Sequence, residues 1–373
     1  MTKGIILLAA GGTGGHLFPA EALGHELHAR GYAVHLVTDA RAERFAGKFP
    51  ADEIHVVPSA TFGSKNPVAV ARALWTLWKG LRMARRLVTR LRPLAVVGFG
   101  GYPTVPPLLA STGLGVPSIV HEQNAIIGRA NKALATRVQA IAGGFLPVAG
   151  PHAAKIYETG NPVRPAVLAA AETPYPVPGE SGALRLVVFG GSQGARFFSE
   201  MVPQAIARLD QHLRNRLVLT QQARPEDETA LKAEYARLGV KADVAPFFSN
   251  LPQRMADAHL VLSRSGASTV LELAVIGRPS ILVPLPHSLD DDQGHNAQVL
   301  VGAGAALMRR QPAITAESLS ADLASLLKDP ARLTEMAASA RGRARTDATV
   351  LLAGLVEAMA SGKTIAQFKG VQP

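Results

Sequence analysis

Short apolar runs alternate with amphipathic segments along the chain. In the first part of the chain these runs are rich in Val, Ile, Leu and Ala, which predicts buried strands. After the first run, the segment 17–30 places its apolar residues at helical spacing and ends before Gly31, so it predicts a helix. Strands separated by helices favour a parallel α/β architecture. The predicted strands cover residues 4–10, 34–39, 94–99 and 117–122.

The pattern starts again near residue 184. The segment LRLVVFGGSQGAR (184–196) repeats the layout of GIILLAAGGTGGH (4–16), in which a glycine-rich turn joins an apolar strand to a helix. We therefore predict two Rossmann-like halves joined near GNPVRP (160–165). A last helix at about 349–360 can pack on either half. Further strands are predicted at 217–220, 243–247, 259–263 and 280–285.

Composition supports two large cores and excludes several classes of protein. The 373 residues are 47% hydrophobic and include no cysteine, which excludes disorder, a disulfide scaffold and a cysteine nucleophile. The apolar run after Lys3 is too short for the core of a signal peptide. The uncharged stretch 94–120 contains Pro103, Pro106, Pro107 and Pro117, so we predict no membrane-spanning helix.

The net charge of +11 indicates an anionic partner, and the basic residues are unevenly distributed. No Asp or Glu lies between Ile54 and His121, a stretch that carries eight Lys and Arg residues. No nucleic-acid recognition motif appears, so we expect no nucleic-acid partner.

Within this stretch, the segment 70–91 predicts a helix with one apolar, core-facing stripe. Trp75 lies off the stripe among basic side chains, which suits the headgroups of an anionic membrane. The alternative is a solvated basic face with Trp75 packed under a loop. The stripe consists of Val70, Leu74, Leu77, Leu81, Ala84, Val88 and Leu91. The predicted membrane contacts are Trp75, Trp78, Lys79, Arg82 and Arg86.

The turn after the first strand, Gly11–His16, is a candidate phosphate site. Its glycines let backbone N–H groups approach an oxyanion, and the start of the following helix adds positive potential. The dinucleotide fingerprint is incomplete because Leu17 stands where its third glycine belongs, but Asp39 leaves a nicotinamide enzyme open. A purely structural turn is the other interpretation. His16 is either a general base or a polar residue of the helix start.

The second glycine-rich turn, GGSQG (190–194), fits two kinds of site. Gly-x-Ser-x-Gly between a strand and a helix is the nucleophile elbow of α/β hydrolases, with Ser192 as the nucleophile. Asp257 or Asp290, together with His295, would complete the triad. No partner loop for an oxyanion is evident, so the sequence favours a diphosphate cradle over a hydrolase.

Other polar segments follow predicted strands. In RSGASTVLE (264–272) a helix begins near Ser268, and Glu272 either caps it or accepts two ribose hydroxyls. The three aspartates at 290–292 either bind a divalent cation or line a sugar site, and adjacent aspartates rarely face one ion, so we predict no metal. FGGY (99–102) and HEQN (121–124) should line the same sheet edge as His16.

Six segments in this order span nearly the whole chain: GGTGGH, FGGY, HEQN, GNPVR, GGSQGA and RSGASTVLE. Together they resemble the MurG family of bacterial transferases, which add N-acetylglucosamine (GlcNAc) to lipid I in peptidoglycan synthesis. The resemblance implies two Rossmann-like domains facing across a cleft, the GT-B fold, and a peripheral protein on the cytoplasmic face of the inner membrane. It implies an acceptor and membrane domain over 1–163 and a UDP-GlcNAc donor domain over 164–345. A C-terminal helix at about 346–373 would pack back on the first domain.

The resemblance also implies roles for single residues and no cofactor. His16 is the candidate base for inverting transfer to the muramoyl 4-hydroxyl. Phe248 replaces a branched aliphatic residue common in the family, and Asp292 replaces a second glutamine found in some members. The implied donor-site residues are Thr13, Gly14, Gly15, Asn124, Arg164, Ser192, Phe248, Ala267, Ser268, Thr269, Val270, Leu271, Glu272 and Gln293. The implied acceptor-binding residues are Gly12, Gly100, Gly101 and Tyr102. Another GT-B transferase that uses a UDP-sugar and a soluble acceptor stays open, although the acid-free basic stretch disfavours it.

Overall fold

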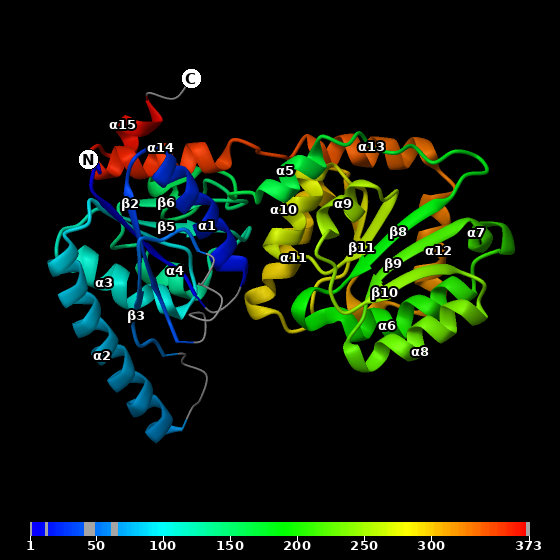
Figure 1. The fold of residues 1–373 in the computed structure, drawn as a ribbon, viewed down its shortest axis with the longest axis horizontal. Coiled ribbons are helices and arrows are strands. Elements are labelled where there is room, and N and C mark those ends of the chain that lie inside the picture. Colours follow the sequence, from blue (N-terminus) through cyan, green and yellow to red (C-terminus); the bar gives the residue numbers. More distant parts are fainter. Residues whose placement is uncertain (1, 12–13, 41–48, 61–65, 371–373) are drawn as a thin grey trace. The chain divides into compact units, whose positions relative to one another are not determined.

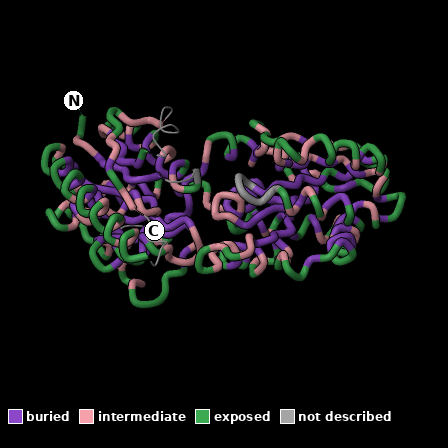
Figure 2. Tube along the Cα trace, turned by 90° about the horizontal axis from the view of Figure 1, so that it is seen from below, coloured by how far each residue is buried: buried purple, intermediate pink, exposed green. Residues whose placement is uncertain are grey.

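A computed structural model describes residues 2–11, 14–40, 49–60 and 66–370, without the side chains of residues 14 and 191–195. The chain divides into two compact units, residues 1–164 with 345–373, and residues 165–344. Each unit contains one sheet in which every described strand pairs in parallel with its neighbours (Figure 1). In Figure 2 the strands of both units are buried beneath helices whose outer faces are exposed.

The first unit has a sheet of order β3-β2-β1-β4-β5-β6-β7. Its strands are β1 (Ile5–Ala9), β2 (Ala33–Thr38), β3 (Glu53–Val56), β4 (Ala95–Gly98), β5 (Ser118–Glu122), β6 (Ala140–Gly143) and β7 (Ile156–Glu158). Its helices are α1 (Gly14–Ala29), α2 (Pro67–Leu91), η2 (Tyr102–Thr104), α3 (Val105–Gly113), α4 (Arg129–Leu134), η3 (Ala153–Lys155), α14 (Ala348–Ala360) and α15 (Ile365–Lys369).

Alternate residues of β1 enter two different hydrophobic cores, because successive side chains of a strand point to opposite faces. Ile6 and Leu8 pack with residues of α1 and α14, whereas Leu7 packs with residues of α2 and α3. The C-terminal helix α14 therefore belongs to the core of the first unit although it follows the second unit in sequence. Arg30, directly after α1, adds an ion pair to Glu357 of α14, with 2.6 Å between Nη1 and Oε2.

The second unit has a sheet of order β10-β9-β8-β11-β12-β13. Its strands are β8 (Leu184–Phe189), β9 (Leu217–Gln222), β10 (Lys241–Ala245), β11 (Leu260–Ser263), β12 (Ser280–Leu282) and β13 (Ala306–Met308). Its helices are α5 (Pro165–Ala171), α6 (Gly191–Ala207), α7 (Gln211–Arg216), α8 (Pro225–Arg237), α9 (Leu251–Ala256), α10 (Ala267–Ile276), η4 (Leu289–Asp291), α11 (Asp292–Gly302), η5 (Gln311–Ala313), α12 (Ala316–Leu327) and α13 (Pro330–Arg341).

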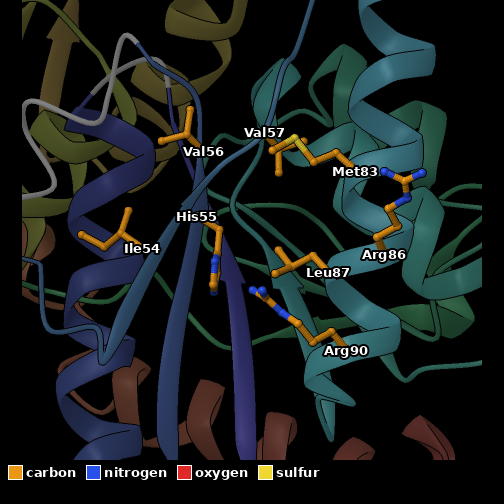
Figure 3. A pocket seen from close by; sticks show the side chains of 8 residues that line it. All are labelled: Ile54, His55, Val56, Val57, Met83, Arg86, Leu87 and Arg90. Carbon is orange, nitrogen blue, oxygen red and sulfur yellow. The ribbon is translucent and has the colours of Figure 1, made fainter.

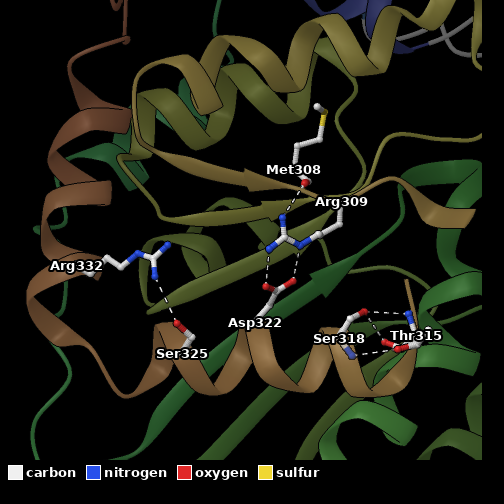
Figure 4. Close-up of polar contacts among 7 residues, drawn as sticks. All are labelled: Met308, Arg309, Thr315, Ser318, Asp322, Ser325 and Arg332. Atoms are coloured by element: carbon white, nitrogen blue, oxygen red, sulfur yellow. Dashed lines mark hydrogen bonds and ion pairs between the residues drawn. The ribbon is translucent and has the colours of Figure 1, made fainter. Parts of the chain in front are cut away.

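Polar contacts fix the end of this sheet to its covering helix (Figure 4). Thr315 and Ser318 form a reciprocal capping box at the start of α12, which satisfies backbone N–H groups that have no partner within the helix. Arg309, directly after β13, donates two hydrogen bonds of 2.7 Å to the carboxylate of Asp322 on α12. Such a bidentate pair restricts both position and orientation, so α12 is held in one register against β13.

The sequence predicted the strands that lie in clear apolar runs. All nine predicted strands are present within a few residues of the expected bounds. The four missed strands, β3, β6, β7 and β13, have three or four residues each. The predicted strands β4, β11 and β12 are equally short, but they belong to longer apolar runs in the sequence. Helix α1 begins at Gly14 rather than Leu17, which places His16 in its first turn.

The predicted core-facing stripe of the 70–91 helix is wrong in its first half. Leu74 is 54% exposed, and burial along α2 begins only at Gly80. Gly80 lies so close to the carbonyl oxygen of Pro58 that a Cβ atom there would come within 2.1 Å of it. The half of α2 that follows Gly80 therefore covers the sheet, while its N-terminal half extends past the strands in Figure 1.

Candidate functional site

Both glycine-rich turns lie at the point where the strand order of their sheet reverses. In the first sheet β1 lies between β2 and β4, so the turns after β1 and β4 leave neighbouring strand ends in opposite directions. In the second sheet β8 has the same place between β9 and β11. Crevices at such switch points are where open α/β sheets bind ligands. The sheet topology therefore places a candidate site on each unit.

In the first unit, a chain of hydrogen bonds orients the imidazole of His16. The side-chain amide of Gln123 lies 3.1 Å from the carbonyl oxygens of Phe99 and His121, so its nitrogen faces them and donates. The amide oxygen of Gln123 must then accept from Nδ1 of His16, 3.1 Å away. The proton of the neutral ring is thus on Nδ1, and Nε2 has no hydrogen-bond partner among the described residues.

The partner of this amide is itself fixed by burial. His121 is fully buried, and desolvation, opposed by a hydrogen bond to the Gly160 carbonyl, lowers its pKa to about 4. Its ring is therefore neutral at pH 7. Because the amide nitrogen of Gln123 lies 2.9 Å from Nδ1, that atom accepts and Nε2 donates to Gly160. The proton positions are therefore consistent from Gly160 to His16, with the two amide hydrogens of Gln123 shared among three acceptors.

Two glycines let the backbone close on the His16 ring. Gly100 and Gly101 have φ angles of +88° and +74°, a region that disfavours any residue with a side chain. A Cβ atom at either position would lie 3.3 Å from the imidazole, near Cε1 at Gly100 and near Cδ2 at Gly101. The FGGY segment therefore forms a wall of the His16 site, with Tyr102 following in η2.

A buried carboxylate shapes the neighbouring loop. Glu122 accepts hydrogen bonds at Oε1 from the backbone and side chain of Asn124, and at Oε2 from the Gly128 backbone and Asn131. These four contacts fix the loop that carries Asn124. The structural roles of Glu122 and Gln123 were not predicted from the sequence. Their signal was present, because Glu122 ends a buried strand and Gln123 directly follows it.

Other predicted residues of the first unit lie in different surroundings. Gly14 and Gly15 form the start of α1, so their N–H groups have no acceptor within the helix. The guanidinium of Arg164 lies over the ring of Phe18, with 4.9 Å between Cζ and the ring centroid. Gly12 and Thr13 lie outside the described residues.

In the second unit, the helices α6 and α10 follow β8 and β11, which are neighbouring strands of the sheet. Gly190 precedes α6, and Gly266 is the N-cap of α10, so the first N–H groups of both helices are available to an anion. Ala267, Ser268 and Thr269 are partly exposed, whereas Val270 and Leu271 are buried. The side chain of Ser192 is outside the described part of the structure.

The position of Glu272 does not fit a capping role. It lies five residues after Ala267, in the second turn of α10, and is 8% exposed. Capping acids lie in the first turn, where N–H groups are unpaired, so capping does not explain this carboxylate. The ribose role stays a prediction from the sequence.

The loop before α11 is built from internal hydrogen bonds. Ser265 donates to the backbone carbonyl of Gln293 over 2.8 Å, and the Gln293 side-chain oxygen accepts from the Leu285 backbone over 2.9 Å. The amide nitrogen of Gln293 has no partner among the described residues. This arrangement leaves a donor for a ligand hydroxyl.

The three aspartates do not converge on one point. Asp291 pairs with the guanidinium of Arg310, which lowers the pKa of that carboxyl, and one of its oxygens lies 2.7 Å from Nη2. Asp292 accepts from the backbone N–H of Gln293 over 2.7 Å.

Phe248 lies under the guanidinium of Arg254, with 4.4 Å between Cζ of Arg254 and the ring centroid.

Comparison with known structures places the fold in one class. The crystal structure of MurG from Acinetobacter baumannii matches with a TM-score of 0.80 at 30% identity, covering 95% of this chain and 99% of that chain. The two parallel sheets and their two glycine-rich turns are therefore those of a GT-B glycosyltransferase.

The family follows from the sequence comparisons. Residues 6–142 match the glycosyltransferase family 28 N-terminal domain, and residues 185–352 match the family's C-terminal domain. The chain belongs to glycosyltransferase family 28. This membership replaces the hydrolase and nicotinamide-enzyme alternatives.

Curated relatives are similar over their full length. The UDP-N-acetylglucosamine–N-acetylmuramyl-(pentapeptide) pyrophosphoryl-undecaprenol N-acetylglucosamine transferase of Agrobacterium fabrum is 65% identical over 99% of this chain and 98% of its own length. The transferase of the same name from Rhizobium meliloti is 64% identical over 99% of both chains.

The buried state of His121 predicts a pH-dependent stability. Its pKa is about 4 in the fold and about 6.5 when unfolded, so the unfolded chain binds an extra proton as the pH falls below 6.5. Stability should decrease from pH 6.5 to pH 4 by up to about 3 kcal/mol from this residue. Urea unfolding of the wild type and of His121→Gln should show a shallower pH dependence in the variant. Equal slopes would contradict the assignment.

Proposed function

We propose that this protein transfers GlcNAc from UDP-GlcNAc to N-acetylmuramyl-(pentapeptide) pyrophosphoryl-undecaprenol, lipid I, and so forms lipid II. The observation that carries the proposal is the identity of 65% to a transferase named for this reaction, over 99% of the chain. Three of the six segments that resemble the family, GGTGGH, GGSQGA and RSGASTVLE, run from a strand end into the start of the helices α1, α6 and α10, with residues 12–13 outside the described part.

The reaction is a single displacement with inversion. Nε2 of His16 accepts the proton of the muramoyl 4-hydroxyl, whose oxygen forms a bond to the anomeric carbon of GlcNAc while the bond from that carbon to the UDP oxygen breaks. The neutral ring with its proton on Nδ1 supports this role, because Gln123 holds Nε2 in the accepting state. Gln123 orients the imidazole through a hydrogen bond and exchanges no proton with it.

The donor and the leaving group are assigned to named residues. The N–H groups that begin α6 and α10 hold the UDP diphosphate and stabilise its charge as it leaves, with Ser192 and Arg164 contributing. Glu272 holds the ribose, Phe248 contacts the uracil, and Asn124 and Gln293 hold the donor sugar. The other donor-site residues are Thr13, Gly14, Gly15 and Ala267–Leu271. The acceptor diphosphate binds at Gly12 and at Gly100–Tyr102. The proposal uses no cofactor.

Two domain roles follow from these assignments. The first unit, with α14 and α15, is the acceptor and membrane domain, and the second unit is the donor domain. The turn after β1 supports the role of the first unit, and the turn after β8 supports the role of the second, because each lies where the strand order of its sheet reverses.

The exposed side of α2 that carries Trp75, Trp78, Lys79, Arg82 and Arg86 is the proposed membrane surface, which we call the Trp75 face. Trp75 and Trp78 are 56% and 44% exposed, and their rings stack with 4.8 Å between centroids. Lys79 lies over Trp75 and Arg82 over Trp78, at 5.5 and 4.7 Å from the ring centroids. Exposure of this size is contrary to the alternative of a tryptophan packed under a loop among the described residues.

This pairing of rings and cations suits a membrane interface. Indole rings favour the headgroup region, and each basic residue near an anionic surface contributes about 1 kcal/mol. In the described part of the chain, no helix is long and apolar enough to cross a membrane. We propose peripheral binding of the Trp75 face to the anionic cytoplasmic surface of the inner membrane, where the undecaprenyl acceptor is anchored.

Replacement of His16 should remove the base. His16→Ala is expected to lower kcat by about 10²–10⁴-fold in an assay with UDP-GlcNAc and a lipid I analogue. His25→Ala, an exposed histidine of the same helix, is the matched control and should keep full activity. A loss confined to the donor KM would show that His16 positions the donor instead.

Replacement of Glu272 should weaken donor binding. Glu272→Ala is expected to cost about 1.5–3 kcal/mol of UDP-GlcNAc affinity, the scale of hydrogen bonds to a charged group. Titration calorimetry with UDP-GlcNAc measures the effect, and Glu226→Gln on an exposed face of α8 serves as the control. Unchanged affinity in a folded Glu272→Ala protein would remove the ribose assignment.

Membrane binding should depend on the Trp75 face. Wild type should co-sediment with anionic vesicles, and the triple variant Trp75→Ala, Arg82→Glu, Arg86→Glu should lose most of this binding, since it removes an indole and reverses two charges. The double variant Arg237→Glu, Arg332→Glu makes the same change in net charge on the second unit and should still bind. Equal loss in both variants would indicate a general charge effect.

A further inference from the structure

Three metal-ligating side chains meet at the outer edge of the first sheet, away from the strand ends that carry His16. His35 lies on β2, and its register partner on β3 is Glu53. His55 is two residues further along β3 and so points to the same face. Among the described residues, these three form the one group of His, Asp or Glu side chains close enough to share a metal ion, with ligand atoms all within 4.8 Å of one another.

The distances from His35 to the other two side chains are close to those in a bound metal site. Nδ1 of His35 lies 3.0 Å from Nε2 of His55 and 3.7 Å from a carboxylate oxygen of Glu53. Bonds of about 2.0–2.1 Å at tetrahedral angles separate two ligand atoms by about 3.3 Å. All three side chains have ligand atoms within 4.8 Å of one another, so side-chain adjustments of roughly 1 Å or less would let one metal bind all three.

The surroundings hold the two imidazoles in place. The side chains of His35 and His55 are 11% and 9% exposed, and their rings stack with 5.3 Å between centroids. His55 borders a cavity of about 370 Å³ between β3 and α2, which is also lined by Leu87 and Arg90 (Figure 3). Glu53 is 53% exposed, so a fourth coordination position would be open to solvent.

We propose that His35, Glu53 and His55 form a binding site for a divalent transition metal, with Zn²⁺ as the preferred ion. Two imidazoles and one carboxylate are the ligand set that suits Zn²⁺, whereas Mg²⁺ and Ca²⁺ favour oxygen ligands. The metal would connect the four-residue edge strand β3 to β2. Its role is structural, because none of its ligands belongs to the proposed reaction.

Arg90 competes with the metal for the carboxylate. Its guanidinium lies 4.0 Å from Glu53, and in Figure 3 it points toward His55. The Arg90 side chain is 65% exposed, so it can withdraw into solvent when a cation binds. Removal of the Arg90 side chain should therefore strengthen metal binding, whereas removal of a ligand should weaken it.

The test measures Zn²⁺ binding to the full chain after removal of metals by EDTA and dialysis. Titration calorimetry should show one site per wild-type chain. His55→Gln and Glu53→Gln should each weaken binding by more than about 100-fold, beyond the 10–100-fold loss that follows when only a partner of a ligand is removed. Arg90→Ala should tighten binding by about 1.5- to 5-fold, the scale of one exposed ion pair.

Two controls separate this site from general binding to histidines. His28 pairs with Asp52 over 3.0 Å, an exposed histidine and carboxylate without a third ligand, so His28→Gln should leave Zn²⁺ binding unchanged. Co²⁺ should give the visible absorption of four- or five-coordinate cobalt with wild type and lose it with Glu53→Gln, which is exposed enough not to threaten folding.

Stability and activity should respond differently to the metal. Zn²⁺ should raise the Tm of wild type but not of His55→Gln, because the metal binds only the folded arrangement. Transferase activity at 25 °C should survive EDTA. Zn²⁺ binding that is insensitive to both ligand variants, binding seen only at millimolar Zn²⁺, or a cobalt spectrum of the hydrated ion would each overturn the proposal.

Discussion

The parallel direction of every strand is the constraint on which the rest of the structure depends. Parallel strands collect their carboxyl ends at one edge of a sheet, and the reversal of strand order beside β1 and β8 separates the chains that leave those ends. Glycines and helix N-termini at these two places suit an anion, because backbone N–H groups without a partner in the helix point toward the crevice. Helices cover both faces of such a sheet, so its strands need apolar residues at nearly every position.

In the proposed mechanism, the chemistry at the first of these places depends on the protonation of side chains that do not themselves react. His121 is neutral because it is buried, and its acceptor nitrogen orients the amide of Gln123. That amide in turn leaves Nε2 of His16 as the accepting nitrogen. Burial of one imidazole therefore sets the state of another, which is how a fold can prepare a base at neutral pH without changing the residue that reacts.

Helix α2 lies in two different surroundings along its length. From Gly80 onward it packs on the sheet through Ala84, Leu87 and Val88, and Arg90 lines the cavity beside His55. Before Gly80, none of its residues is buried among the described part of the chain, and Leu74 and both tryptophans are exposed. Exposed apolar side chains of this kind are stable in water only at a cost, and the proposed contact with a membrane surface would remove that cost.

The sequence by itself determined the α/β class, the two halves, the long strands and the glycine-rich turns, because each depends on residues close together in the chain. The sequence also predicted site roles for His16, Asn124 and Glu272, since strand ends are marked locally, and these roles stay predictions. Tertiary structure alone decided the proton arrangement through Gln123, the exposure of Leu74, and the packing of α14 in the first core. It also brought His35 beside His55, twenty residues apart. The physical reason is that strand register, burial and hydrogen-bond partners are set by segments far apart in sequence, and periodicity carries no information about them.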